Sequence, residues 1–158
     1  MDKQLRGRCT CGHVKYRLKR EPLFVHCCHC TWCQRETGSA FAINVLIEAE
    51  NVETLSGELE KILTPSESGK GQQIWRCPKC KVALWSNYRG TKDIVRFVRA
   101  GTLDDPSQVK PDVHIYTRSK VTWVKLPDGA RAFAIYYDVE SEWPASSLER
   151  RKAYVDKY

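Results

Sequence analysis

Three cysteines within a short stretch have the types and the spacing of a metal chelate with an open position. The stretch is Cys27-Cys28-His29-Cys30-Thr31-Trp32-Cys33. Neighbouring Cα atoms lie about 3.8 Å apart and their side chains point to opposite faces of an extended segment, so Cys27 and Cys28 are not expected to hold one ion. Cys28, Cys30 and Cys33 form the natural chelate. Three protein ligands and a free fourth position are typical of a catalytic zinc, and an open three-sulfur site invites a thiol.

A closed site is the alternative for the same stretch. His26, His29 or Cys27 could fill the fourth position and complete a second structural zinc. His29 lies between two ligands and is most simply expected to point away from the ion. It would then support the ligands without binding the metal. Cys27 is then expected to be a buried thiol without a ligand role.

The other four cysteines come as two close pairs, Cys9-Thr10-Cys11 and Cys77-Pro78-Lys79-Cys80. Structural zinc is satisfied by four thiolates in a tetrahedron at roughly 2.3 Å each. The two pairs are far apart in the chain, so a shared ion would pin an N-terminal strand to a central hairpin. We therefore expect two Zn²⁺ per chain, one structural on Cys9, Cys11, Cys77 and Cys80, and one catalytic on Cys28, Cys30 and Cys33.

Eight cysteines could instead form disulfides, since their number is even. The start of the chain has no apolar region typical of export, and the longest apolar stretch, near 132–137, is far shorter than a membrane span. We therefore expect a reducing, cytoplasmic location without a membrane. Cysteines are more often metal ligands or catalytic groups than disulfides in such a location.

Length and charge set broad limits on the kind of protein. The 158 residues suit a single domain, 1–158, with a core at about 5–140. The formal net charge of +7 permits attraction to phosphate-rich partners or to an anionic small substrate. Zinc-bound thiolates reduce this excess, because each carries a negative charge.

The positions that carry the cysteines are expected on short strands. Alternating apolar residues and β-branched runs predict a mainly β protein of small antiparallel sheets. The expected strands are 13–18, 23–25, 41–47, 52–55, 59–63, 74–76, 82–85, 94–100, 114–116, 121–124 and 132–137. Helices are expected at 31–37, closed by Gly38, and in a basic tail at 146–157, where Ser146 to Glu149 fits a capping box.

Several motifs together resemble the glutathione-dependent formaldehyde-activating (GFA) enzymes, whose relatives include centromere protein V. The motifs are Gly7-Arg8-Cys9-Thr10-Cys11-Gly12, Cys28-His29-Cys30-Thr31-Trp32-Cys33-Gln34-Arg35-Glu36-Thr37-Gly38, Cys77-Pro78-Lys79-Cys80, and Gly101-Thr102-Leu103-Asp104-Asp105 with Pro111 and His114-Ile115-Tyr116. The resemblance covers most of the chain. The sequence departs from it at Gln34, where family members often carry a second basic residue, and in the extra Cys27.

The resemblance implies a zinc-stabilised, tent-like β fold and the same division of the seven cysteines into a structural and a catalytic set. It implies a carbon-sulfur lyase that adds glutathione to formaldehyde, or to a related small aldehyde, and gives S-(hydroxymethyl)glutathione. Arg35 is a candidate partner for the carboxylates of the tripeptide, although an exposed helix charge is the simpler interpretation. His114 is a candidate proton donor that we leave outside the expected site, and Trp32 is a candidate wall of the pocket.

Two other functions remain open at this point. The first is a binding module without chemistry, in which two zinc ions hold a basic β fold for a protein or a nucleic acid. Basic residues alternate with acidic ones, so nucleic acid is not the partner we expect. The second is the same chemistry with another thiol or aldehyde, because function depends on the site rather than on the scaffold. The sequence indicates no oligomeric state.

Overall fold

The computed structural model describes residues 4–88 and 93–157. The strands are β1 (Arg6–Arg8), β2 (Lys15–Leu18), β3 (Phe24–Cys28), β4 (Ala42–Glu48), β5 (Val52–Ser56), β6 (Glu60–Thr64), β7 (Gln72–Arg76), β8 (Ala83–Tyr88), β9 (Val95–Arg99) and β10 (Val113–Ile115). The helices are α1 (Thr31–Thr37), α2 (Val139–Glu142) and α3 (Ala145–Lys157), with short 3₁₀ turns at Ala49–Asn51, Ala100–Thr102, Pro106–Gln108 and Thr117–Ser119.

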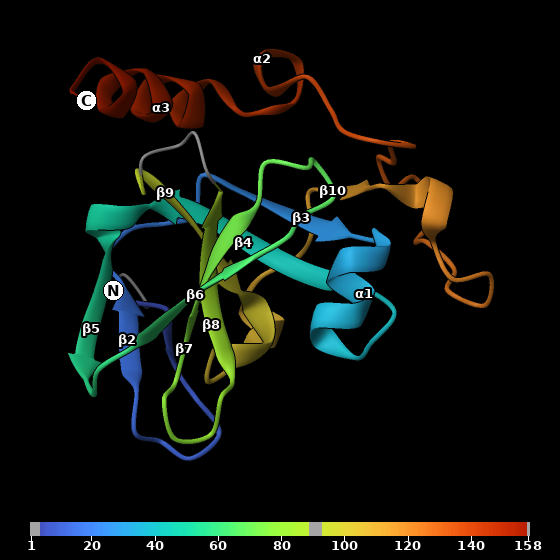
Figure 1. Cartoon of the computed structure of the whole chain (residues 1–158). Coiled ribbons are helices and arrows are strands. Elements are labelled where there is room, and N and C mark those ends of the chain that lie inside the picture. Colours follow the sequence, from blue (N-terminus) through green and yellow to red (C-terminus); the bar gives the residue numbers. More distant parts are fainter. Residues whose placement is uncertain (1–3, 89–92, 158) are drawn as a thin grey trace.

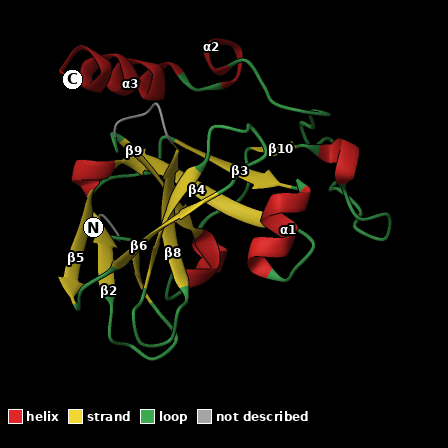
Figure 2. Ribbon diagram, in the orientation of Figure 1, coloured by secondary structure: helices red, strands yellow, loops and turns green. Residues whose placement is uncertain are grey.

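The strands form two sheets, as the expected mainly β class requires. One sheet has three strands in the order β1-β2-β5, and the other has seven in the order β10-β3-β4-β9-β8-β7-β6. The named strand pairs are antiparallel except that β10 runs parallel to β3. Figure 2 shows the strands gathered in the centre and lower left of the view, with α3 and α2 at the top and α1 to the right. The predicted fold class is confirmed.

The alternation of side chains along β4 divides the buried residues into two cores. Val45 and Ile47 belong to a core that lies against the three-stranded sheet and includes Tyr16, which we call the inter-sheet core. Leu46 lies on the opposite face, in a core shared with Trp143 of the C-terminal segment, which we call the tail-side core. A strand that is buried on both faces is expected to be apolar throughout, and β4 is nearly so.

The C-terminal segment covers one end of the tail-side core, and Figure 1 shows α3 lying across that end of the molecule, next to β9 and β3. Arg150 on α3 donates from Nε and Nη2 to the buried Glu48 carboxylate at 2.8 and 2.6 Å. Ser147 Oγ donates to the Leu23 carbonyl at 2.6 Å. The helix begins at Ala145, so Ser146 lies inside its first turn and is not the predicted N-cap. No helix in residues 4–88 or 93–157 has the length and apolar character that crossing a membrane requires.

Two predicted strands, 121–124 and 132–137, are wrong. The first is a turn, in which Val124 N donates to Val121 O at 3.1 Å. The second makes only one isolated bridge, between Ala132 and His114, and packs Phe133 and Tyr137 against the tail-side core. Phe133 N donates to His114 O at 2.9 Å and Tyr116 N donates to Ile135 O at 2.7 Å, so the segment lies alongside β10 without forming a regular strand.

Candidate metal centres and the cavity beside them

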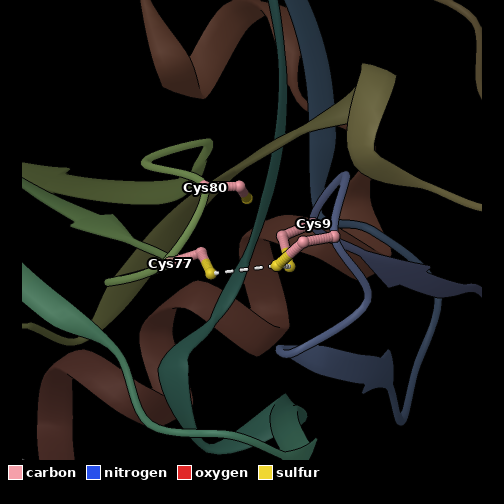
Figure 3. A group of neighbouring side chains, drawn as sticks. Cys9, Cys77 and Cys80 are labelled. Atoms are coloured by element: carbon pink, nitrogen blue, oxygen red, sulfur yellow. Dashed lines mark hydrogen bonds between the residues drawn. The ribbon is translucent and has the colours of Figure 1, made fainter.

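Two turns from different parts of the chain bring four sulfur atoms together. Cys9 and Cys11 flank the turn between β1 and β2, and Cys77 and Cys80 flank the turn between β7 and β8. Figure 3 shows the sulfur atom of Cys77 facing the Cys9 turn, with Cys80 on the same hairpin as Cys77. The four Sγ atoms lie within 4.8 Å of one another.

Local backbone geometry directs these sulfur atoms inward. Each turn closes on a residue in the left-handed region, Gly12 with φ 77° and Lys81 with φ 64°. Val14 N donates to Cys9 Sγ at 3.3 Å, and Cys77 N pairs with Val82 O at 3.0 Å to complete the second turn. Backbone N–H groups aimed at sulfur favour its thiolate form. The sequence Cys-Thr-Cys-Gly therefore supplies both ligands and the glycine that the turn requires.

The spacing of the four sulfur atoms fits a zinc ion. Cys9 Sγ and Cys11 Sγ are 3.6 Å apart, and Cys11 Sγ and Cys77 Sγ are 3.7 Å apart. A tetrahedron with bonds of roughly 2.3 Å places its sulfur atoms about 3.8 Å apart. All eight cysteines lie in the described residues and are free, so the disulfide alternative is wrong.

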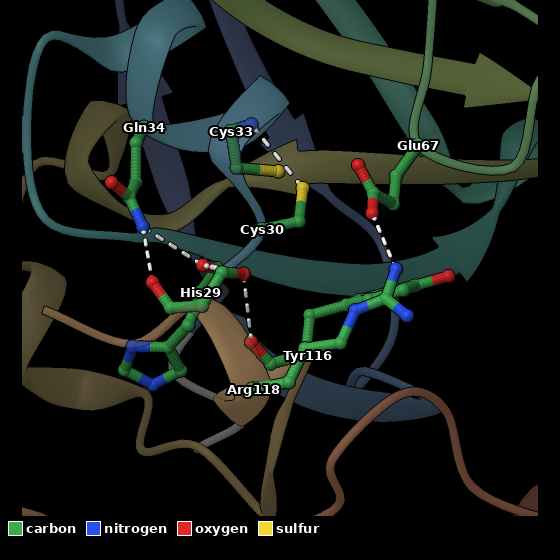
Figure 4. Close-up of polar contacts among 8 residues, drawn as sticks. His29, Cys30, Cys33, Gln34, Glu67, Tyr116 and Arg118 are labelled. Carbon is green, nitrogen blue, oxygen red and sulfur yellow. Dashed lines mark hydrogen bonds and ion pairs between the residues drawn. The ribbon is translucent and has the colours of Figure 1, made fainter.

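The second cluster lies where β3 meets α1. Cys28 ends β3, Cys30 is the N-cap of α1, and Cys33 is in the first turn of that helix. Cys33 N donates to Cys30 Sγ at 3.3 Å, the contact drawn in Figure 4. The three Sγ atoms lie within 4.8 Å of one another and the three side chains are buried. The predicted chelate is thus brought together, from an extended piece and the first turn of a helix.

The peptide that carries these cysteines is tied to the segment after β10. Gln34 Nε2 donates to the carbonyl oxygens of His29 and Ser119, at 2.9 Å each. Ser119 Oγ donates to the same His29 carbonyl at 3.0 Å, and His29 N donates to Ile115 O at 3.0 Å. Figure 4 shows Gln34 reaching across to this segment. The amide at position 34, where the sequence departs from a second basic residue, therefore has a structural role.

Cys28, Cys30 and Cys33, which we call the three-thiol cluster, can ionise together only if a cation is bound. Hydrogen bonds from Cys28 and Cys33 lower the pKa of Cys30 to about 3, and the bond to Cys30 raises the pKa of Cys28. Thus one thiolate suppresses ionisation of its neighbours. A divalent ion would allow all three to ionise, leaving a net charge of about −1. The buried Arg99 lies within electrostatic reach of Cys33 and of His26, and its positive charge offsets that excess.

A cavity of about 490 Å³ opens beside the three-thiol cluster. Its lining residues are His26, Cys28, Cys30, Trp32, Cys33, Asn44, Ser66, Glu67, Ser68, Lys70, Gln72, Tyr88, Phe97, Ile115, Tyr116 and Tyr136. All three cysteines reach it, and Trp32 forms part of the wall, as expected. The volume is in the range of small-molecule sites, and the lining is mostly apolar with a few polar groups, as is usual for them.

The cation on this lining is Lys70, on the loop between β6 and β7. Arg118 lies at the rim and donates to the Glu67 carboxylate at 2.8 Å, as Figure 4 shows. Arg35 is exposed on α1 and does not line the cavity, which agrees with its simpler interpretation as a surface charge. No sequence pattern singles out Lys70, because only the fold brings its loop to the cavity that the cysteines line.

Buried polar residues lie on the cavity lining, and two of them, Asn44 and Gln72, were not predicted from the sequence, where His26 was considered only as a possible fourth ligand. His26, Asn44 and Gln72 each have a side-chain atom without a hydrogen-bond partner in the described residues. Burial lowers the pKa of His26 to about 3, and the charge of Arg99 acts in the same direction, so the imidazole is neutral. A signal was present for Asn44, the one amide within the apolar stretch 41–47. A polar residue in the middle of a buried strand marks a position with a special role.

A third group, made of Cys27, His29 and His114, lies on the other face of β3. Their ligand atoms are within 4.8 Å of one another. His29 Nε2 and His114 Nδ1 are 2.9 Å apart, a hydrogen-bond distance, whereas two nitrogen ligands of one tetrahedral zinc would be about 3.3 Å apart. The three-thiol cluster in the described residues includes none of Cys27, His26 and His29. The side chains of Cys27, His26 and His29 therefore lie outside the group that the three thiols form.

Comparison with known proteins gives one family. The family model described as glutathione-dependent formaldehyde-activating enzyme matches residues 4–119, which include the seven cysteines of the two clusters. No curated protein matches the sequence. A structural-genomics crystal structure of a Rhodobacter sphaeroides protein is similar at 17% identity and a TM-score of 0.47, covering 81% of this chain and 98% of that one. A likeness this weak carries no argument about function.

Proposed function

The chain belongs to the glutathione-dependent formaldehyde-activating enzyme family, and on that premise we propose that it adds a thiol to formaldehyde or to a related small aldehyde. With glutathione the product is S-(hydroxymethyl)glutathione, so the protein would be a carbon-sulfur lyase in the reverse direction. The observation that carries this proposal is the three-thiol cluster on the wall of a cavity. A site for chemistry needs an open ligand position that substrate can reach, and these three cysteines supply it.

We propose two zinc ions per chain, held by the two clusters. Cys9, Cys11, Cys77 and Cys80 would close a structural site, and Cys28, Cys30 and Cys33 would hold the second ion. When bound there, zinc supplies a lowered pKa for the thiol of the substrate, so that thiolate is available at neutral pH. The eight free cysteines suit a reducing compartment, and we propose the cytoplasm.

The residues of the cavity bind and orient the substrate in this proposal. Tyr88, Phe97 and Tyr116 form apolar walls that exclude water from the reacting atoms. Lys70 is placed to bind a carboxylate of the tripeptide at the open end. The sulfur lone pair forms the new C–S bond, and the π electrons of the carbonyl move to the aldehyde oxygen. That oxygen then takes a proton from water, and the proton of the thiol is released to solvent.

Calorimetry and NMR test the proposal directly. Glutathione is titrated into the zinc-loaded protein and into Cys30→Ser, and formaldehyde is then added while adduct formation is followed by NMR. We expect saturable binding that Cys30→Ser abolishes, with the adduct formed faster than in the spontaneous reaction. Lys61→Ala serves as a control, since Lys61 is on an exposed part of β6 away from the cavity lining. Absence of both binding and acceleration would overturn the proposal in favour of a binding module or another thiol.

A further inference from the structure

Three residues of the cavity lining each have a buried polar atom that lacks a hydrogen-bond partner among the described residues. These atoms are His26 Nδ1, Asn44 Nδ2 and Gln72 Oε1. The relative exposures of these residues are only 3%, 1% and 3%. Buried polar atoms are nearly always hydrogen-bonded, because an unpaired one costs about 1–3 kcal/mol. His26 and Asn44 are cross-strand partners in β3 and β4, so this part of the lining has two unpaired polar groups side by side that a polar ligand atom could satisfy.

The orientation of the Asn44 amide follows from its neighbour. Arg99 Nη1 donates to Asn44 Oδ1, and the two residues are cross-strand partners in β4 and β9. A guanidinium group has donors and no acceptor, so the amide oxygen must face Arg99. The amide NH₂ group therefore points away from Arg99 and is left with a free donor. The amide oxygen and nitrogen of Asn44 can therefore be told apart by their hydrogen-bonding partner.

Asn44 also lies at a suitable distance from the cysteine cluster. Cys28 pairs with Ala42 and His26 pairs with Asn44 in the antiparallel β3–β4 ladder. Asn44 is therefore the diagonal neighbour of Cys28 on the same face of the sheet, a relation in which Cα atoms lie about 7–8 Å apart. A substrate sulfur held at the cysteine cluster can carry its new carbon and oxygen atoms into this gap.

We propose that Asn44 Nδ2 donates a hydrogen bond to the aldehyde oxygen, and that Arg99 is the residue that positions it. This inference rests on the proposed function of the same cavity. As the C–S bond forms, the carbonyl π electrons become a lone pair on oxygen, and a donor aimed at that oxygen binds more strongly as its charge develops. Water supplies the proton that completes the hydroxyl group, so thiol and aldehyde give the hydroxymethyl thioether without an oxidant or reductant. Asn44 is thus a catalytic residue, and the site selects a small carbonyl compound.

Kinetics of matched asparagine variants test the role of Asn44. Asn44→Ala is expected to lower kcat by about 10²-fold, with the KM for glutathione and the zinc content unchanged, because the lost contact exists mainly in the transition state. Asn87→Ala is the control, since Asn87 is equally buried in β8 but bonds to Trp75 and Gln73 outside the cavity lining. Equal kcat values for the two variants would overturn the inference.

A second variant pair tests the positioning role of Arg99. Arg99→Met removes both the donor and the charge, and we expect kcat to fall while KM stays within about twofold. Arg99→Lys retains a donor and a charge and is expected to recover part of the loss. If Arg99→Met left kcat unchanged, or lowered it only together with zinc content, Arg99 would not position Asn44.

An NMR measurement separates this inference from the proposed function. The side-chain NH₂ signals of Asn44 are identified in ¹⁵N-labelled protein by their absence in Asn44→Asp. Preformed S-(hydroxymethyl)glutathione is expected to shift them, and glutathione alone is not. A shift in a protein that does not accelerate the reaction would support the donor role and reject the proposed activity. Acceleration without a shift would support the activity and reject the role of Asn44, and absence of both would reject the two together.

Discussion

The two sides of the seven-stranded sheet bury similar apolar residues but are closed in different ways. On one side the inter-sheet core lies against the three-stranded sheet, and it includes Cys9 and Cys77 of the four-thiol cluster. On the other side the tail-side core includes all three cysteines of the open cluster, and part of its cover is the C-terminal segment with Trp143. On the first side four sulfur atoms come together, whereas on the second side three do, and all three of those cysteines line a cavity of about 490 Å³.

On the proposed function, the same ligand chemistry serves two purposes in this protein. Four thiolates satisfy a tetrahedral ion, so nothing further can bind and the gain is stability. Three thiolates beside a cavity leave a position for substrate, at the cost of a less complete site. The fold keeps the two apart by placing them on opposite faces of a single sheet. We therefore expect substitutions on one face to change stability and those on the other to change activity.

The largest expected effect is a loss of stability when the cluster of Cys9, Cys11, Cys77 and Cys80 is changed. Cys9→Ser removes one of four ligands, and we expect it to destabilise the whole domain. The binding free energy of structural zinc is part of the folding free energy and is comparable to the total stability of a domain, about 5–15 kcal/mol. Thermal denaturation followed by circular dichroism, with zinc analysis, measures the effect. If Cys9→Ser melted at the wild-type temperature, the prediction that this cluster stabilises the domain would be wrong.

The second prediction concerns the open side. Cys28→Ser is expected to reduce adduct formation to the spontaneous rate while the fold is largely kept, because Cys28 is one of only three ligands on the cavity wall. The melting temperature should fall much less than in Cys9→Ser. Equal thermal losses in the two variants would contradict the division between the clusters. One zinc per chain in a fully folded, active protein would contradict it as well.

Sequence spacing was sufficient to predict both clusters, because each pair or triplet is held by its own local turn. The Cys28-x-Cys30-x-x-Cys33 spacing already requires an extended piece followed by a helical turn, which β3 and α1 provide. The mainly β class followed from alternation in the same way. These features depend on neighbours in the chain, and local patterns are what a single sequence reveals best.

The remainder of the site depends on contacts between distant segments. Lys70, Asn44 and Arg99 come from a loop and two strands that only the order of the large sheet brings to one cavity. The apolar stretch 132–137 was predicted as a strand, yet it forms one isolated bridge and packs Phe133 and Tyr137 against the tail-side core. A short, wholly apolar run has no alternation that would distinguish a regular strand from an irregular segment, so the sequence could not separate the two.

A smaller effect is expected where the C-terminal segment covers the open side. Burial alone would raise the pKa of Glu48, but hydrogen bonds from Arg150 and Asn51 outweigh it and hold that pKa below its ordinary value. The carboxylate thus stabilises the fold above the unfolded pKa of about 4.3, and this contribution is lost as the pH falls through the folded value. Arg150→Ala leaves the charge buried and unpaired, which is expected to cost about 3 kcal/mol at pH 7.

The pH dependence of that cost identifies its origin. The difference in unfolding free energy between wild type and Arg150→Ala, measured by urea denaturation, should shrink as the pH falls. The unpaired Glu48 of the folded variant takes up its proton at a higher pH than the paired Glu48 of folded wild type, whereas the two unfolded chains titrate alike. Arg151→Ala is the control, because Arg151 pairs with the exposed Glu140 and such pairs contribute about 0–1 kcal/mol. A cost that does not change with pH would assign the effect to lost packing of α3 instead of the ion pair.

The smallest effect is expected from the cation that binds a substrate carboxylate. Lys70 and Arg35 are the two candidates. Lys70 lines the cavity and Arg35 is exposed on α1, so Lys70→Ala should raise the KM for glutathione about threefold without changing kcat, and Arg35→Ala should change neither. A thiol without carboxylates, such as 2-mercaptoethanol, should not distinguish Lys70→Ala from wild type. If Arg35→Ala raised the KM instead, the substrate carboxylate would bind at the exposed surface of α1. The cavity lined by Lys70 would then not be the route to Cys28, Cys30 and Cys33.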